Sequence, residues 1–407
     1  MVAINPFKAL RYNLERIALS DVICPPYDVI APAAREQLCR QSPYNVVRLE
    51  LPADGSTRDR YANARQILEA WSRQGVLIRD PQPAVYLSEH TFRWGGQSWR
   101  RMGWIALLSL DGPVTQHVLS HEATFETPKA DRTRLLTSVR AQLSPIFCVV
   151  PDAKSLLLWL QAVAHATAPT ATAQVHATED VVRLWTITDP QVIARLQQEL
   201  ASKSVLIADG HHRFSVALAN RELCRGVMTY FACAEDPALH VHPIHRVVRM
   251  APVDPAVWQG RLRNLCDVTP LSSLDELTRQ LEGAQGSGQF GYYAQGHYAH
   301  VAVRCPTPSK ITAGTAGTEN LDVTVLHQRV LPHLFGEAPK AETFQYTPYQ
   351  EEAIRLADES SAACAWLLRP LPLSQVFALA SQRVTLPQKS TYFYPKALAG
   401  LVVYPFD

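Results

Sequence analysis

The chain has 407 residues, 47% hydrophobic and 19% charged, a balance typical of a folded protein of two or three domains. Its 39 Lys and Arg against 37 Asp and Glu give a net charge of +2, which argues against nucleic acid or an anionic membrane as the main partner. Eight scattered cysteines without a C-x-x-C pair favour neither a zinc ribbon nor a disulfide scaffold. With no signal-peptide pattern and no apolar stretch long enough to cross a bilayer, we expect a cytoplasmic protein.

The first 45 residues predict irregular structure. Ile23–Ile30 contains two adjacent prolines, which lack amide donors and fix φ, so a rigid surface loop is expected there. Residues 45–51 predict a strand. The further strands expected in chain order are 84–92, 99–110, 146–150, 184–187, 205–208 and 227–232, and the helices are 59–73, 153–164, 191–200 and 214–223.

Beyond residue 250 the chain changes character, with helices and a hairpin within 289–303. We therefore divide the chain into an N-terminal α+β region (1–110), a central region (111–250) and a C-terminal α+β region (251–407). Residues 286–291 match G-x-G-x-x-G, but a hairpin follows where a dinucleotide site requires a helix, so this match predicts no cofactor.

The strongest local signal is the turn Asp209-Gly210-His211-His212-Arg213, which follows an apolar strand and opens a helix. Free backbone N–H groups at a helix start favour an anion, and Arg213 with the two histidines adds donors suited to phosphate. Asp209 could hold a metal ion or a substrate hydroxyl. The alternative is an ordinary strand–turn–helix in which Asp209 only caps the helix.

A second polar segment, 118–132, carries acids and bases between a strand and a helix. Glu122 is a candidate general base, and Lys129 or Arg132 a phosphate clamp. The alternative is a solvated loop whose last residues open a helix.

Two further stretches are weaker candidates. His245 and Arg246 lie in a strand-like run, where a structural role is the alternative. Lys389 precedes two hydroxyl residues and an aromatic cluster, which suits an anion, although a C-terminal strand that packs its aromatics is the favoured alternative.

Motifs along almost the whole chain resemble one bacterial family, the Domain of Unknown Function 1015 family. They are the segments 6–12, 25–30, 42–49, 121–122, 128–132, 144–147, 208–213, 245–248 and 389–396.

The D-G-H-H-R turn is also similar to that of archaeal free-serine kinases, which belong to the superfamily of ParB-like proteins and sulfiredoxins. This resemblance implies a turn that holds nucleotide phosphates, ADP-dependent phosphorylation of L-serine, and two key acids. Asp209 matches one acid directly, and Glu122 matches the other by character alone. His211 stands where a sulfiredoxin needs cysteine, and the near-neutral charge does not suit a ParB-like DNA binder.

The fold expected from these resemblances is mixed α/β, with a ParB/sulfiredoxin-like core at 111–250 flanked by the other two regions. The expected function is phosphoryl transfer from ATP or ADP, with Mg²⁺, to a hydroxyl, most simply that of free L-serine to give O-phosphoserine. The expected partners are thus a nucleotide and a small-molecule substrate, with no nucleic acid or membrane, and a homodimer is one candidate assembly. The alternatives are a nucleotide-binding regulatory protein without phosphotransfer and a structural protein whose turn only caps a helix.

The candidate residues fall into three groups by expected role. The catalytic candidates are Glu122, Asp209 and His121, with Asp209 also the metal ligand. The nucleotide or phosphate ligands are Gly210, His211, His212, Arg213, Lys129, Arg132 and Lys389, and the substrate ligands are Tyr27, Asp28, His245 and Arg246.

Overall fold

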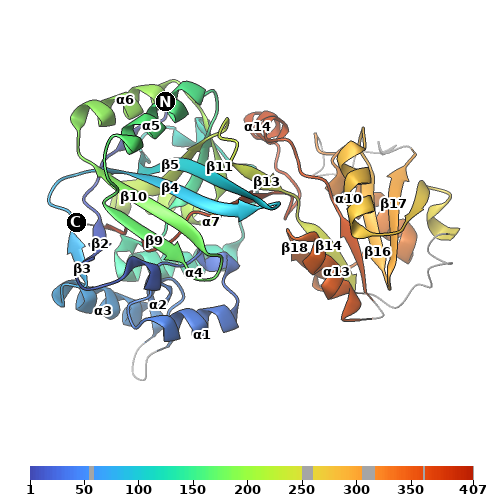
Figure 1. The fold of residues 1–407 in the computed structure, drawn as a ribbon, viewed down its shortest axis with the longest axis horizontal. Helices are drawn as coiled ribbons and strands as arrows, with labels where there is room; N and C mark the ends of the chain where they lie inside the picture. Colours follow the sequence, from blue (N-terminus) through green and yellow to red (C-terminus); the bar gives the residue numbers. More distant parts are fainter. Residues whose placement is uncertain (55–58, 250–259, 305–316, 361–362, 407) are drawn as a thin grey trace. The chain divides into compact units, whose positions relative to one another are not determined.

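The computed structural model describes residues 1–54, 59–249, 260–304, 317–360 and 363–406, and the chain forms two compact units (Figure 1). Unit 1 comprises Met1–His240 together with Pro395–Asp407, and unit 2 comprises Val241–Tyr394. Both units combine helices with a sheet, so the predicted mixed α/β class is confirmed. The three-part division of the chain stays a prediction. None of the helices in these ranges is long and apolar enough to cross a membrane.

Unit 1 is built on a nine-stranded mixed sheet in the order β6-β11-β8-β12-β5-β4-β10-β9, with β1 added beside β5. The strands β8 and β11 are short and buried along their whole length, as expected for strands covered on both faces. The nine strands are β1 (Ile4–Asn5), β4 (Val85–Trp94), β5 (Gln97–Ser109), β6 (Val118–Leu119), β8 (Ile146–Val150), β9 (Ala171–Val175), β10 (Asp180–Ile187), β11 (Val205–Asp209) and β12 (Gly226–Cys233).

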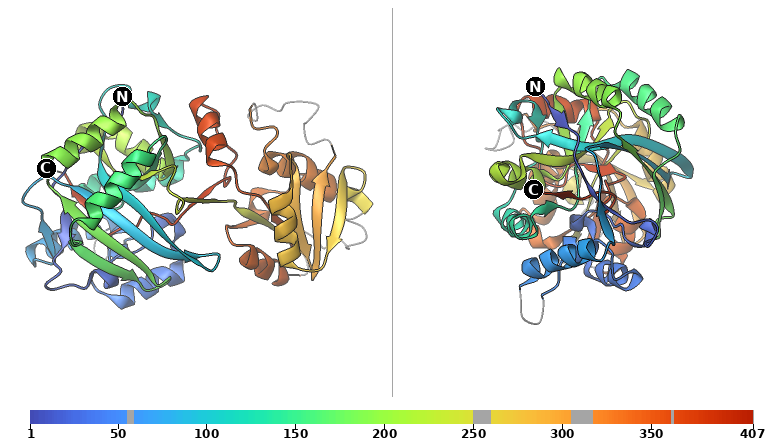
Figure 2. Two further views of the ribbon diagram at one scale, coloured as in Figure 1. Left: turned by 45° about the horizontal axis from the view of Figure 1, so that its top comes forward. Right: turned by 90° about the vertical axis from the view of Figure 1, so that its left-hand side faces the viewer.

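The helices of unit 1 lie on opposite sides of this sheet. Figures 1 and 2 show α5 and α6 on one side and the N-terminal helices on the other. Leucines of α5 and α6 join alternate strand residues such as Trp104 and Phe231 in one hydrophobic core. The helices are α1 (Pro32–Gln41), α2 (Val47–Glu50), α3 (Arg60–Arg73), α4 (Glu126–Val139), α5 (Lys154–His165), α6 (Pro190–Ala201), α7 (His211–Ala219) and α8 (Arg221–Cys224), with a 3₁₀ turn η2 at Tyr27–Val29.

Two short antiparallel strand pairs in unit 1 involve residues near the two ends of the chain. The strand β2 (Leu10–Tyr12) pairs with β3 (Leu77–Arg79), and β21 (Tyr404–Pro405) pairs with β7 (Ala141–Gln142). The C-terminal segment therefore returns to unit 1 after the chain has completed unit 2.

Unit 2 contains a six-stranded antiparallel sheet in the order β15-β17-β16-β19-β14-β18, whose core includes Leu277 and Leu281 of α10 and two alanines of α13. Its strands are β14 (His245–Arg249), β15 (Cys266–Leu271), β16 (Gln289–Ala294), β17 (His297–Val303), β18 (Phe344–Thr347) and β19 (Ala363–Leu367), and β13 (His240–His242) pairs with β20 (Tyr392–Tyr394). Its helices are α10 (Leu274–Gly283), α11 (Asp322–Val325), α12 (Leu331–Phe335), α13 (Gln350–Asp358) and α14 (Leu373–Ser381).

Most sequence-based elements are confirmed, including the hairpins of β4 with β5 and of β16 with β17. The strand predicted at 45–51 is wrong, because this segment forms the helical turn α2. The Asn45 Oδ1 accepts a hydrogen bond from Val47 N and starts that turn, and buried packing overrides the extended preference of the valines. The first 45 residues also contain α1, which begins with a proline at its first helical position.

Candidate functional site

The side chain of Asp209 is aimed by an irregularity at the end of β11. Ile207 lies opposite Cys148 of β8, but Asp209 lies opposite Phe147, so one extra residue is inserted between them. Side chains alternate between the faces of a strand, and a single inserted residue therefore turns Asp209 to the face opposite that of Ile207. Asp209 thus leaves the face that packs against α5 and α6 and points to the more polar one.

Gly210 makes the turn from β11 into α7. Its φ of 90° and ψ of 28° are left-handed, and a Cβ atom there would lie 2.9 Å from Cγ2 of Ile146. Gly210, not Asp209, is the N-cap residue of α7, and no side chain caps this helix. The alternative in which Asp209 serves as a helix cap is therefore wrong.

Asp209 instead binds two cations. Its Oδ2 accepts a hydrogen bond from Nη2 of Arg213 at 2.7 Å, and its Oδ1 accepts one from Nζ of Lys396. The three side chains are only 10–11% exposed. Burial alone would raise the pKa of Asp209, but the charges of Lys396 and Arg213 outweigh it and the pKa is lowered. The site thus holds a buried carboxylate that stays ionised.

Arg213 is fixed by the loop that precedes β8. Its Nη1 donates to Oγ of Ser144 at 3.0 Å and to the carbonyl of Pro145 at 2.6 Å. Its Nε is buried and has no hydrogen-bond partner among the described residues. This guanidinium is therefore held rigidly, and one of its buried donors is unsatisfied.

The N-terminal turn η2 supplies Tyr27 and Asp28 to the same site. The guanidinium of Arg132 lies 4.1 Å from the centre of the Tyr27 ring, and that of Arg213 lies 5.8 Å from it. Asp28 is accessible to solvent in part, yet desolvation by the surrounding protein atoms raises its pKa. The negative charge of Asp209 raises it further. Asp28 therefore places a second, solvent-accessible carboxylate near Asp209.

Two histidines and Glu122 lie together at the start of α7. The Nδ1 of His211 lies 3.4 Å from Oε2 of Glu122, and the ring of His211 packs edge-on against that of His121 with centroids 4.7 Å apart. Burial lowers the pKa of His211, and it lowers that of fully buried His121 to about 4, so both rings are neutral at pH 7. The Glu122 side chain, by contrast, is 32% exposed.

The loop that carries Glu122 is attached to α7 by a second contact. The backbone N–H of Phe125 donates to Nε2 of His212 at 3.0 Å. Together with the contact between Glu122 and His211, this bond brings two segments that lie 87 positions apart onto the same turn. The structure therefore places the loop of Glu122 beside the turn that follows Asp209.

A pocket lined mainly by apolar side chains adjoins Arg213. Its polar lining includes Arg132 of α4, whose Nη1 lies 3.5 Å from Oε2 of Glu50 and which also pairs with Asp131. Its apolar walls come from Leu135, Leu136, Leu143, Ile146, Val216 and Val227. Lys129, on the same helix as Arg132, pairs instead with Glu126.

Three candidates belong to unit 2 rather than to unit 1. His245 accepts a hydrogen bond from the backbone N–H of Leu368, and burial lowers its pKa to about 3. Arg246 is buried and donates to His327 and to the carbonyl of Gln388, which are contacts within its own unit. Lys389 is exposed.

Sequence reasoning missed Lys396 as a site residue. It lies 187 positions from Asp209, in the segment that returns to unit 1. The signal was present, because the C-terminal motif that contains Lys389 ends at Lys396, but the sequence alone does not indicate which lysine reaches the turn.

Residues 4–324 match the family model described as "Protein of unknown function (DUF1015)". No curated protein matches the sequence. A conserved hypothetical protein from Pyrococcus furiosus is similar in structure with a TM-score of 0.35 and 11% identity, covering 71% of this chain and 90% of that one.

Two other solved structures are similar at the same level. SbnI from Staphylococcus aureus, with a C-terminal truncation, has a TM-score of 0.36 and 11% identity over 73% of this chain and 86% of its own. A free serine kinase in complex with AMP has a TM-score of 0.36 and 10% identity over 71% of this chain and 86% of its own.

Proposed function

The chain belongs to the DUF1015 family of proteins of unknown function, and we propose that it transfers a phosphoryl group from ATP or ADP to the hydroxyl of a small polar molecule. Free L-serine is the favoured acceptor. The observation that carries the proposal is the ionised Asp209, buried between Lys396 and Arg213 at the start of α7, where the carboxylate of Glu122 contacts His211.

The start of α7 suits the phosphates of the donor. Backbone N–H groups of the first turn have no partner within the helix and favour an anion, and Arg213 adds a buried Nε–H donor. Lys396 would neutralise charge that develops on the transferred group. The apolar pocket beside Arg213 offers a surface for the base of the nucleotide.

Mg²⁺ fits this site through Asp209, with Asp28 as a second carboxylate near enough for their charges to interact. Among the described residues no group of three metal-ligating side chains occurs, so phosphate oxygens and water would supply the remaining ligands. When bound, the ion would offset the negative charge of the phosphates.

Glu122 is the proposed general base. In the transfer step the acceptor oxygen would form a bond to the terminal phosphorus while the bond from that phosphorus to the bridging oxygen breaks. The hydroxyl proton would pass to Glu122, and the shortened nucleotide would leave with the electron pair of the broken bond. His211 would position Glu122, and His121, which is fully buried, would support the ring of His211 rather than touch a ligand.

A nucleotide-binding regulatory protein is the second candidate. Both carboxylate oxygens of Asp209 already accept hydrogen bonds from cations, as expected for a structural ion pair. A pure binder would hold nucleotide without consuming it.

Turnover separates these two functions. The full-length chain is incubated with ATP or ADP, Mg²⁺ and a panel of hydroxyl amino acids and sugars, and phosphorylated products are detected by mass. Glu122→Gln should lower turnover by at least about a hundredfold, whereas Glu222→Gln, with a side chain 98% exposed, serves as the matched control. Nucleotide binding without product from any acceptor would favour the regulatory protein, and wild-type turnover in Glu122→Gln would exclude Glu122 as the base.

A further inference from the structure

Glu50, the last residue of α2, is a buried carboxylate with one unsatisfied oxygen. The residue is 2% exposed. Its Oε2 lies 3.5 Å from Nη1 of Arg132, and the same Nη1 donates to its backbone carbonyl at 3.0 Å. Its Oε1 has no hydrogen-bond partner among the described residues. A buried acceptor without a donor costs free energy comparable to a lost hydrogen bond, so such an oxygen calls for an explanation.

Glu50 lines the apolar pocket beside Arg213. The other polar side chains of this pocket already use their acceptors. The amide oxygen of Gln142 accepts a hydrogen bond from the backbone N–H of Met228 at 2.6 Å, and Oγ of Ser144 accepts one from Arg213 at 3.0 Å. Among the lining side chains that the structure describes, the carboxylate of Glu50 therefore has the acceptor oxygen that a ligand could satisfy.

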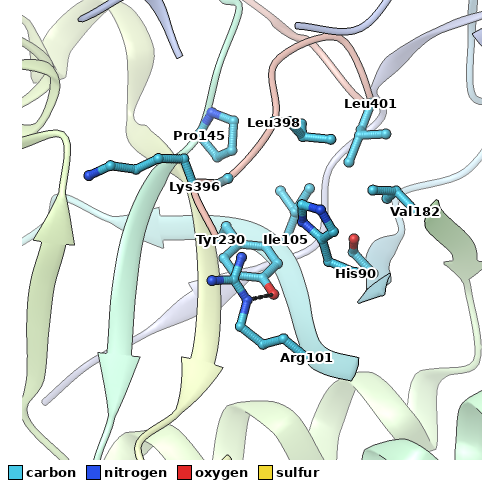
Figure 3. Close-up of a pocket in the computed structure, with 11 residues that line it drawn as sticks. His90, Arg101, Ile105, Pro145, Val182, Tyr230, Lys396, Leu398 and Leu401 are labelled. Carbon is cyan, nitrogen blue, oxygen red and sulfur yellow. Dashed lines mark hydrogen bonds between the residues drawn. The ribbon is translucent and has the colours of Figure 1, made fainter. Parts of the chain in front are cut away.

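The pocket has room for the edge of a planar ring. The space in it that water could fill is about 50 Å³, several times the roughly 10–15 Å³ that one water needs. A second cavity, lined among others by His90, Arg101 and Tyr230 (Figure 3), offers only about 10 Å³ and holds no more than one water. The edge of a nucleotide base can therefore enter the pocket beside Arg213, whereas it cannot enter the second cavity.

Purine bases differ in the group that they present at position 6. Adenine has an amino group there, which donates hydrogen bonds, whereas hypoxanthine and guanine have a carbonyl oxygen, which only accepts them. A carboxylate oxygen binds the amino group and repels the carbonyl, because two acceptors then face each other. The terminal torsion of a glutamate is soft, so the unsatisfied oxygen can turn towards a donor in the pocket while the backbone stays in place.

We propose that Glu50 accepts a hydrogen bond from the 6-amino group of adenine and thereby selects an adenine nucleotide as the phosphoryl donor. Arg213 borders both this pocket and the start of α7, so a nucleotide with its phosphates at that helix start would have its base directed to the pocket. Arg132 is a positioning residue, because it holds Oε2 and the backbone carbonyl of Glu50 and leaves Oε1 for the base. This inference deepens the proposed function and rests on it for the place of the phosphates, but selection of adenine by Glu50 requires no phosphoryl transfer.

The test compares nucleotides that differ at position 6 of the base. Calorimetric titration of the full-length chain with Mg²⁺ at neutral pH uses ADP, purine riboside 5′-diphosphate, which has a hydrogen at position 6, and IDP, which has a carbonyl. All three carry the same ribose and phosphates, so differences in affinity report contacts of the base. We expect ADP to bind at least about tenfold more tightly than the purine riboside compound, as for a hydrogen bond to a charged group, and IDP to bind most weakly.

Glu50→Gln keeps the size of the side chain but replaces one carboxylate oxygen by an amino group, which can donate to the carbonyl of IDP. The variant should therefore lower the preference for ADP over IDP by at least about tenfold. The matched control is Glu36→Gln on α1, where the side chain is 67% exposed, and it should keep the wild-type order.

Each outcome decides the inference. Equal affinity of the wild type for ADP and IDP overturns it, even if Glu50→Gln does not fold, and so does a preference for ADP that Glu50→Gln retains in full. Binding of none of the three nucleotides overturns both this inference and the proposed function. Selective binding of ADP without a phosphorylated product supports the role of Glu50 and refutes phosphoryl transfer, whereas equal affinity and equal product yield with ADP and IDP do the reverse.

Discussion

Replacing Asp209 by asparagine should destabilise the protein as well as inactivate it. The side chain keeps its shape, but the buried cations of Lys396 and Arg213 lose the charge that compensates both. Removing one partner of a buried ion pair typically costs about 3–5 kcal/mol. That is a large part of the roughly 5–15 kcal/mol by which a domain is stable, so the urea midpoint should fall clearly, and turnover should fall by at least about a hundredfold.

The assay is urea unfolding followed by circular dichroism at pH 7, alongside nucleotide turnover. The pKa of Asp209 is lowered in the folded state, so its stabilisation is complete above the ordinary value near 3.9 and is lost as the pH falls through the folded value. Neutral pH therefore reports the whole effect. The double variant Asp209→Asn/Lys396→Met should recover part of the loss, because one uncompensated cation has been removed.

Two results would refute this reasoning separately. An Asp209→Asn protein with the wild-type midpoint would show that the two cations do not depend on the carboxylate for their burial. Wild-type turnover in the same variant would remove Asp209 from the chemistry and leave it a structural residue.

Further outcomes are expected at neighbouring positions. Gly210→Ala should lower the melting temperature more than Gly112→Ala, because both glycines have positive φ but only at Gly210 would the new Cβ meet a side chain, at 2.9 Å. Arg213→Ala should weaken ADP binding, measured by calorimetry, by about ten- to a hundredfold, as expected for a lost charged hydrogen bond. A histidine that is buried and neutral in the folded protein gains a proton only on unfolding. Below about pH 6.5 the free energy of unfolding should therefore fall by up to about 1.4 kcal/mol per pH unit for each such residue. The variant His121→Asn should reduce this slope, whereas His176→Asn, at an exposed position, should not.

The turn at Asp209 could be predicted because its signals are local. Residues 205–219 contain an apolar strand, a glycine and a helix with regularly spaced apolar residues. All three signals predict the same strand–turn–helix unit. The inserted residue that turns Asp209 to the other face could not be predicted, because it is defined by the register against β8 rather than by β11 itself.

The partners of that turn could be predicted only in part. Glu122 could be singled out because its segment is rich in acids and bases. Lys396 could not, because its motif also contains Lys389 and the sequence does not indicate which of the two lysines binds Asp209.

The ion pairs of Asp209 and its proposed chemistry are compatible on electrostatic grounds. Without ligand, Lys396 and Arg213 both bind the carboxylate of Asp209, so these three buried groups together carry one net positive charge. Donor phosphates carry several negative charges and would accept hydrogen bonds from both cations, which reduces their hold on Asp209. The carboxylate would then be available to Mg²⁺ or to the acceptor hydroxyl only when nucleotide is present. The same two cations that keep Asp209 ionised in the free protein would thus prevent it from acting until the donor has bound.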